Sequence, residues 1–166
     1  MLPPIISVVG KKKSGKTTLI EKLLPALKSR GLKVATIKRD AHKFDMDKPG
    51  KDTYRHFEAG ADAVVISSSE KMAMIRRTDE ELSLDEVVSK YLGEDFDLVI
   101  TEGYKRDAKP KIEVHRAEIS HEVLCGPSDN MFAMVTDDDI KVNCRKFGHT
   151  EIEALADFIV LTFGIR

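Results

Sequence analysis

The segment from Gly10 to Thr17 has the residue types and spacing of a phosphate-binding loop (P-loop). It fits G-x-x-x-x-G-K-[ST] completely, directly after a β-branched run and at the start of a helical pattern. Gly10 and Gly15 allow the backbone to curl so that successive N–H groups face inward at the positive end of a helix. Lys16 is expected to reach the β- and γ-phosphates, and the Thr17 hydroxyl is expected to bind Mg²⁺. The sequence therefore predicts a site for a nucleoside triphosphate with Mg²⁺, formed by Gly10, Lys11, Lys12, Lys13, Ser14, Gly15, Lys16, Thr17 and Thr18.

The lysines inside this loop allow more than one interpretation. Lys11, Lys12 and Lys13 either contribute charge to the phosphate site or form a solvated basic loop. Lys11 also holds the position where one class of P-loop protein directs a lysine at the nucleotide of a neighbouring subunit.

A P-loop needs a carboxylate at the end of another core strand, because one hydroxyl is a weak ligand for a hard cation. Glu102 follows the predicted strand 97–101. It is favoured over Asp97, which opens that strand at the far edge of the sheet. Asp40 follows the second strand at the same carboxyl edge and is a second candidate to hold Mg²⁺ or to position the attacking water. Lys16, Asp40 and Glu102 are thus the candidate catalytic residues, with surface carboxylates as the alternative for both acids.

Other polar residues after the second strand raise a different possibility. His42, Asp45 and Asp47 place a histidine and carboxylates close together in sequence, which could form a second metal site. Their spacing matches no standard metal motif, and a polar loop is the alternative. Cys125 and Cys144 have no metal-type spacing and are interpreted as reduced structural thiols.

The elements that must position these groups alternate between strand and helix. Apolar and β-branched runs predict strands at 5–9, 33–38, 63–67, 72–76, 97–101, 112–115 and 131–135, and helical periodicity predicts helices at 17–30, 53–58, 83–91 and 150–161. This pattern predicts an α/β protein with a mostly parallel twisted sheet in three layers, helices covering both faces, as in P-loop NTPases. A length of 166 residues without an interdomain linker predicts a single nucleotide-binding domain spanning 1–166.

Charge and hydropathy exclude several classes of partner. The net charge of −1 argues against general nucleic-acid binding, which needs a cationic excess. The N-terminus lacks the basic region of a signal peptide and no apolar run reaches membrane-spanning length, so we expect a cytoplasmic protein without membrane contacts. A local basic basin is nevertheless predicted at the carboxyl edge, suited to a second phosphate-bearing ligand, from Lys48, Lys51, Arg55, Lys105, Arg106, Lys109 and Lys111.

The base of the nucleotide is less clearly specified than its phosphates. The usual guanine reader, Asn/Thr-Lys-x-Asp after a late strand, does not occur there. The turn 136–139, Thr-Asp-Asp-Asp, is the best-placed substitute, because one of its carboxylates could accept from guanine N1 and N2. A solvated acidic turn is the alternative.

Taken together, these segments resemble the MobB family of molybdopterin-guanine dinucleotide biosynthesis adapters over essentially the whole chain. Besides the P-loop, the resemblance rests on 36–44, 47–55, 59–61, 101–105 and 110–114. It implies a cytoplasmic, homodimeric GTP-binding protein with weak GTPase activity, which uses Mg²⁺ and assists the molybdopterin guanylyltransferase that attaches GMP to molybdopterin. Arg39 departs from the histidine that the family more often has. Two other functions remain open: a P-loop small-molecule kinase with its acceptor in the basic basin, and a nucleotide-gated metallochaperone using His42.

Overall fold

The computed structural model describes residues 2–39 and 44–165, and their contacts divide the chain into two compact units. Unit 1 consists of residues 1–39 and 88–166, and unit 2 of residues 40–87. Each unit is described separately below.

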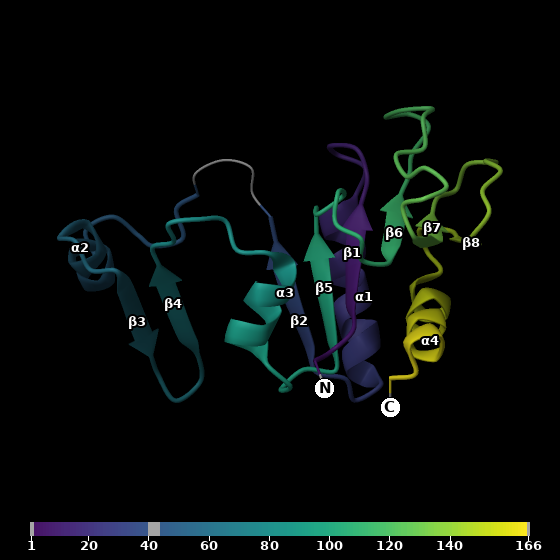
Figure 1. The fold of residues 1–166 in the computed structure, drawn as a ribbon. Helices are drawn as coiled ribbons and strands as arrows, with labels where there is room; N and C mark the ends of the chain where they lie inside the picture. Colours follow the sequence, from purple (N-terminus) through teal and green to yellow (C-terminus); the bar gives the residue numbers. More distant parts are fainter. Residues whose placement is uncertain (1, 40–43, 166) are drawn as a thin grey trace. The chain divides into compact units, whose positions relative to one another are not determined.

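Unit 1 is built on a six-stranded parallel sheet with the strand order β2-β5-β1-β6-β7-β8 (Figure 1). The strands are β1 (Ile5–Val9), β2 (Val34–Lys38), β5 (Leu98–Glu102), β6 (Lys111–Val114), β7 (Met131–Val135) and β8 (Arg145–Phe147). Because every pair is parallel, all six carboxyl ends meet at one edge of the sheet. Loops that follow these strands are therefore brought together there.

Two helices of unit 1, α1 (Lys16–Ser29) and α4 (Ile152–Phe163), share one core with the sheet. Leu23 and Leu27 of α1 and Ile159 of α4 are fully buried, as the three- and four-residue spacing of apolar side chains requires. Burying each such side chain contributes about 1.5–3 kcal/mol. The predicted α/β class with a mostly parallel sheet is confirmed.

The central strand β6 points its alternate residues to opposite faces of the sheet. Ile112 and Val114 belong to the core shared with α1 and α4, whereas Lys111 and Glu113 are buried without belonging to that core. Glu113 accepts hydrogen bonds from the N–H groups of Leu124 (2.7 Å) and Cys125 (2.8 Å) and so holds the loop that follows β6. The segment after β6 is therefore a loop that the buried Glu113 holds against the sheet, and not a helix.

Unit 2 contains α2 (Asp52–Glu58), the antiparallel hairpin β3 (Ala63–Ser67) and β4 (Met72–Arg76), and the short helix α3 (Leu84–Val87). Ser83 and Glu86 form the reciprocal cap that their spacing predicts, with Ser83 N–H donating to the Glu86 carboxylate at 2.9 Å. The hairpin leaves large apolar side chains exposed, namely Val65, Ile66, Met72 and Met74.

Two elements differ from the sequence prediction. The predicted helix 83–91 is α3 followed by a π-helical segment, η1 (Val88–Leu92), and β8 was not predicted. In β8 only Phe147 is buried, so a three-residue strand beginning Arg-Lys carries almost no apolar signal. Within 2–39 and 44–165, no helix combines the length and apolar character needed to cross a bilayer.

Candidate nucleotide-binding site

The loop between β1 and α1 presents an uncapped helix N-terminus. Gly15 is the N-cap of α1 in the left-handed region (φ 98°), no side chain caps the helix, and its first turn contains no acidic residue. The first N–H groups of a helix need acceptors, and here a ligand can supply them. An anion at this position would be stabilised by those N–H groups and by the helix dipole.

The curl of the loop depends on backbone conformations that few residues adopt. Gly10 has φ 152° and Lys13 has φ 68°. A Cβ on Gly10 would lie 2.5 Å from the Val114 carbonyl oxygen and 2.6 Å from Ser14 Oγ, so only glycine fits between β6 and the loop. The sequence prediction that glycine shapes this loop is therefore supported by the packing at Gly10.

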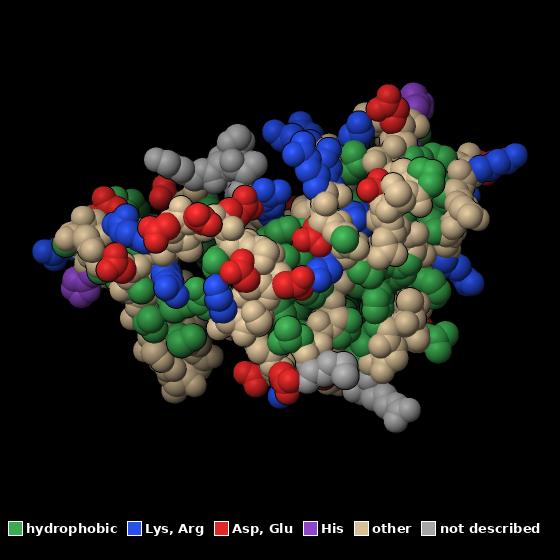
Figure 2. Space-filling view, viewed as in Figure 1, with side chains coloured by type: hydrophobic (Ala, Val, Ile, Leu, Met, Phe, Trp, Pro, Cys, Tyr) green, Lys and Arg blue, Asp and Glu red, His purple; other side chains and the backbone are tan. Residues whose placement is uncertain are grey.

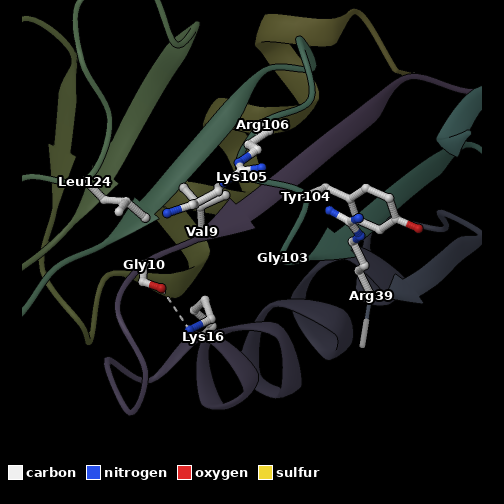
Figure 3. Close-up of a pocket in the computed structure, with 9 residues that line it drawn as sticks. All are labelled: Val9, Gly10, Lys16, Arg39, Gly103, Tyr104, Lys105, Arg106 and Leu124. Atoms are coloured by element: carbon white, nitrogen blue, oxygen red, sulfur yellow. Dashed lines mark hydrogen bonds between the residues drawn. The ribbon is translucent and has the colours of Figure 1, made fainter. Parts of the chain in front are cut away.

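The Lys16 ammonium lies across the inside of the loop. Its Nζ donates to the carbonyl oxygens of Gly10 (3.0 Å) and Lys11 (2.9 Å), and Figure 3 shows the first of these bonds. Burial lowers the Lys16 pKa from its ordinary value, the Glu102 carboxylate opposes that shift, and Lys38 adds to it. A partly desolvated cation held by neutral carbonyls would gain from a phosphate acceptor.

The hydroxyl of Thr17, in the first turn of α1, and the carboxylate of Glu102, at the end of β5, lie together, because β5 pairs with the strand β1 that leads into the P-loop. Thr17 Oγ1 donates to Glu102 Oε2 at 3.0 Å, and Lys38 Nζ lies 3.7 Å from Glu102 Oε1. Asp97 lies at the opposite end of β5, where its Oδ2 accepts from Lys33 N–H at 2.7 Å. Two oxygen donors beside a phosphate loop suit Mg²⁺, which takes few protein ligands and completes its shell with phosphate oxygens and water. Thr17 and Glu102 would hold that ion.

The structure describes only part of the loop that follows β2. Asp40 and His42 lie outside the described residues, so the proposed roles of Asp40 in metal binding and catalysis, and of His42 in a second metal site, stay predictions. Within the described ranges, no three His, Cys, Asp or Glu side chains gather as metal ligands. Cys125 and Cys144 are free, and burial, with the Glu113 charge, raises the pKa of Cys125 to about 12.

A cationic cavity of about 270 Å³ opens beside the P-loop (Figure 3). Among its lining residues are the cations Lys16, Arg39, Lys105 and Arg106, and none of the nine lining residues within the described part of the chain is acidic. The Arg39 guanidinium lies 5.9 Å from the centre of the Tyr104 ring. Figure 2 shows lysine and arginine side chains gathered where β1 and β5 end in Figure 1. Part of the predicted basic basin therefore exists within unit 1.

Lys111 was wrongly assigned to that basin. It is only 1% exposed, and its Nζ donates to the carbonyl oxygens of Asp107 (2.5 Å), Lys109 (3.2 Å) and Asp129 (2.9 Å). The reason is its register: it opens the central strand β6 opposite Ser7 of β1. Lys48, Lys51 and Arg55 belong to unit 2.

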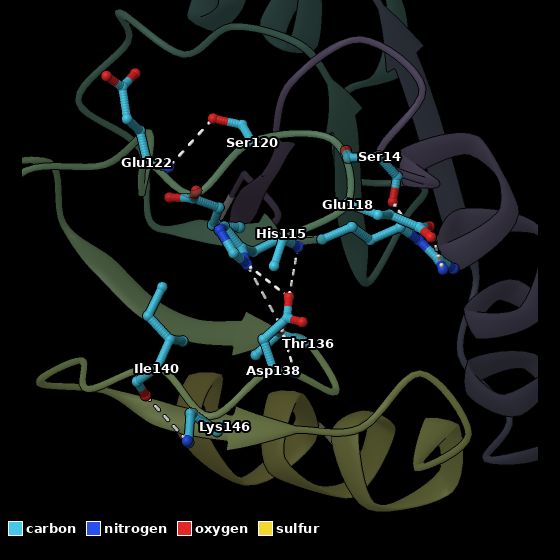
Figure 4. Close-up of polar contacts among 12 residues, drawn as sticks. Ser14, His115, Glu118, Ser120, Glu122, Thr136, Asp138, Ile140 and Lys146 are labelled. Atoms are coloured by element: carbon cyan, nitrogen blue, oxygen red, sulfur yellow. Dashed lines mark hydrogen bonds and ion pairs between the residues drawn. The ribbon is translucent and has the colours of Figure 1, made fainter.

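A second cavity, of about 200 Å³, lies where β6, β7 and β8 end. It is lined by Arg116, Ala117, Glu118, Asp137, Asp138 and His149. Asp138 Oδ2 accepts from the Ala117 N–H at 2.6 Å and from Thr136 Oγ1 at 3.0 Å, and lies 3.1 Å from His115 Nδ1 (Figure 4). The Ala117 bond is the main cause of a lowered Asp138 pKa.

Sequence reasoning found the acidic turn of this cavity but missed its other wall. Arg116 and His149 were not singled out, although each follows a strand at the carboxyl edge. Arg116 follows β6 by two residues and reaches the P-loop, where its Nε donates to the Ser14 carbonyl oxygen at 3.1 Å. The rule that ligands bind at the carboxyl ends of parallel strands would have found Arg116; His149 required knowledge of β8.

The parallel sheet, the phosphate loop at the end of β1 and the Thr17–Glu102 pair at the edge of two neighbouring strands define a P-loop NTPase fold. A family profile described as molybdopterin guanine dinucleotide synthesis protein B (MobB) matches residues 5–137. The chain belongs to the MobB family.

Relatives and solved structures agree with this assignment. The chain is 35% identical over 156 residues to a molybdopterin-guanine dinucleotide biosynthesis adapter protein of Haemophilus influenzae, covering 94% of this chain and 87% of the relative. It is 33% identical over 160 residues to the Escherichia coli protein of the same name, covering 95% and 91%. A crystal structure of molybdopterin-guanine biosynthesis protein B (mobB) is 36% identical, with a TM-score of 0.78 and coverage of 96% and 99%. The resemblance seen in the sequence is confirmed.

Proposed function

We propose that this chain is a GTP- and Mg²⁺-binding adapter with slow GTPase activity, which assists the enzyme that attaches GMP to molybdopterin. The observation that carries the nucleotide part is the uncapped P-loop with Lys16 across it and the Thr17–Glu102 pair beside it. The adapter role is supported by the names of the relatives. Mg²⁺ would supply charge stabilisation at the phosphates, and Lys16 would bind and orient them.

Slow turnover is expected from the composition of the cavity beside the P-loop. Phosphoryl transfer needs the attacking water to be positioned as well as charge to be neutralised. The nine lining residues supply cations, but none carries a carboxylate, an imidazole or a side-chain amide to orient water. The described lining thus favours holding a triphosphate, and Asp40, the sequence candidate for positioning the water, lies outside the described residues.

Calorimetry with Mg·GTP tests the nucleotide site. Lys16→Ala should abolish measurable binding and leave the fold intact, since its loss removes the cation from the centre of the loop. Lys22→Ala, on an exposed position of the same helix α1, is the matched control and should bind as the parent does. Unchanged affinity in Lys16→Ala would refute the assignment. Glu102→Gln should weaken the dependence of binding on Mg²⁺ while a titration without Mg²⁺ changes little.

The cations Arg39, Lys105 and Arg106 favour a second candidate function that also needs testing. They fit a phosphate-bearing ligand beside the γ-phosphate, either molybdopterin held for a partner enzyme or the acceptor of a small-molecule kinase. Incubation with GTP or ATP and candidate acceptors distinguishes the adapter from the kinase. Rapid acceptor-dependent phosphorylation would establish the kinase and refute the adapter.

The proposal also includes a cytoplasmic homodimer, as the family implies. The exposed apolar side chains of the β3–β4 hairpin support self-association, because such residues are depleted from monomer surfaces. Light scattering coupled to gel filtration measures the mass in solution. A monomer at micromolar concentration would refute the dimer without affecting the nucleotide site.

A further inference from the structure

The cavity at the ends of β6, β7 and β8 is separate from the groups assigned to phosphate and metal. Its lining residues are those that follow three strands at the carboxyl edge, and Arg116 joins it to the P-loop. A Cβ on Gly15 would lie 3.6 Å from Arg116 Nε and 3.7 Å from its Nη2, so the guanidinium lies against the loop itself. A ligand whose phosphates fill the P-loop would have its remaining part close to this cavity.

The two neighbouring aspartates of the turn 136–139 that line the cavity, Asp137 and Asp138, make different hydrogen bonds. Asp138 is occupied by its bonds to Ala117 and Thr136, and so it fixes the cavity wall. Asp137 accepts the His149 N–H at 3.0 Å through Oδ1, which leaves its Oδ2 as an acceptor for a ligand. Asp139 does not line the cavity.

His149 supplies a second acceptor. Burial and then the Arg116 charge lower its pKa, which favours the neutral ring. The buried Nε2 of the ring has no partner among the described residues. A neutral imidazole has one donor and one acceptor nitrogen, so with Nδ1 protonated Nε2 carries a lone pair. A buried polar atom without a partner is uncommon in a native fold, and a ligand can satisfy it.

Arg116 lines the same cavity as these acceptors. Its Nε bond to Ser14 and its contact with Glu118 (Nη1 to Oε1, 3.5 Å) hold the guanidinium in place. A planar guanidinium stacks on aromatic rings, including nucleobases. The cavity therefore combines a flat cation with hydrogen-bond acceptors.

From this arrangement we infer that the cavity is the base subsite of the nucleotide held by the P-loop, that Asp137 selects guanine, and that Arg116 positions the base. The inference rests on the proposed function. Guanine presents two donors on its Watson–Crick edge, N1–H and the 2-amino group, and these match carboxylate and imidazole acceptors. Adenine presents an unprotonated N1 there, which a carboxylate repels. A second phosphate is excluded, because Asp137, Asp138 and Glu118 would repel it.

A four-nucleotide titration tests the role of Asp137. Mg·GTP, ATP, ITP and XTP are titrated into the parent, Asp137→Asn and the control Asp139→Asn, which alters the same turn outside the cavity. The parent should prefer GTP to ATP by at least about a hundredfold and to ITP, which lacks the 2-amino group, by about tenfold, as expected for hydrogen bonds to a charged acceptor. Asp137→Asn should lose GTP affinity about tenfold or more and gain XTP affinity, because its amide donates to the xanthine 2-oxygen. A gain of XTP binding cannot come from misfolding.

The outcomes separate the two proposals. If the parent binds no triphosphate, both fail. If it binds GTP and ATP equally, or if Asp137→Asn keeps the parent's GTP preference, the base subsite is refuted while the phosphate site stands. Arg116→Met should weaken GTP and ATP alike and keep their ratio, because stacking is tolerant of base identity. A changed ratio in Arg116→Met with an unchanged ratio in Asp137→Asn would overturn the division of roles.

Discussion

Replacing Gly10 by alanine should destabilise the protein more than any other single-methyl addition at a glycine. The new Cβ would lie 2.5 Å from the Val114 carbonyl oxygen, about 1 Å inside normal contact. Because that oxygen belongs to the backbone of the central strand β6, it cannot move as a side chain does. Overpacking of this kind costs about 1–3 kcal/mol, and the left-handed φ of 152° adds roughly 1 kcal/mol or more. We expect the free energy of unfolding to fall by about 3 kcal/mol.

Urea unfolding followed by circular dichroism measures this loss, and Gly31→Ala separates its two causes. Gly31 also has a left-handed φ, of 83°, but a Cβ there would meet nothing within 4 Å. Gly31→Ala should therefore lose only the conformational part, about 1 kcal/mol. Gly10→Ala should also lose Mg·GTP affinity, because relieving the clash of the new Cβ with Val114 and Ser14 would displace the P-loop backbone. Equal destabilisation in the two variants would refute the packing argument.

Three further results are expected. Lys111→Met should lower the free energy of unfolding by about 2–3 kcal/mol, because three part-buried carbonyls lose their donor; Lys22→Met, on the surface of α1, should change it by less than about 0.5 kcal/mol. The lowered pKa of Asp138, due mainly to the Ala117 N–H, gives stability that is complete above the ordinary value of 3.8 and is lost as pH falls through the lowered value. Asp138→Asn should therefore be less stable than the parent at pH 7, and the difference should shrink in acid; a constant difference from pH 7 to pH 2 would contradict this. Cys125, with a pKa of about 12, should resist alkylation at pH 8 until the protein unfolds, which mass spectrometry of iodoacetamide-treated samples detects.

The parts of the fold that sequence predicted well are those with local signals. The P-loop pattern, the apolar strands and the rule that parallel strands end at one edge are together sufficient to place Thr17 beside Glu102. The hydrogen bond between them depends in addition on strand order, because it is the pairing of β5 with β1 that puts Glu102 next to the P-loop.

The errors and omissions come from long-range register. Lys111 follows Pro110 in a lysine-rich stretch and has the local features of a solvated loop residue, yet its pairing opposite Ser7 buries it completely. β8 pairs with β7 through three residues, two of them charged, so hydropathy could not reveal it. Because β8 was not predicted, His149 could not be placed at the sheet edge either.

Two carboxylates, the buried Glu113 of β6 and the part-exposed Asp138 after β7, explain how loops without helices can form two well-defined cavities. Glu113 holds Leu124, which lines the cationic cavity, and Asp138 holds Ala117, which lines the acidic one. A loop of this length has few apolar contacts of its own, and a buried carboxylate such as Glu113 is costly if it loses its N–H partners. The carboxylates therefore act as fixed points that bring the segment after β6 against the P-loop on both sides. That arrangement places a cationic cavity and an acceptor-rich cavity at one sheet edge of a chain whose net charge is −1.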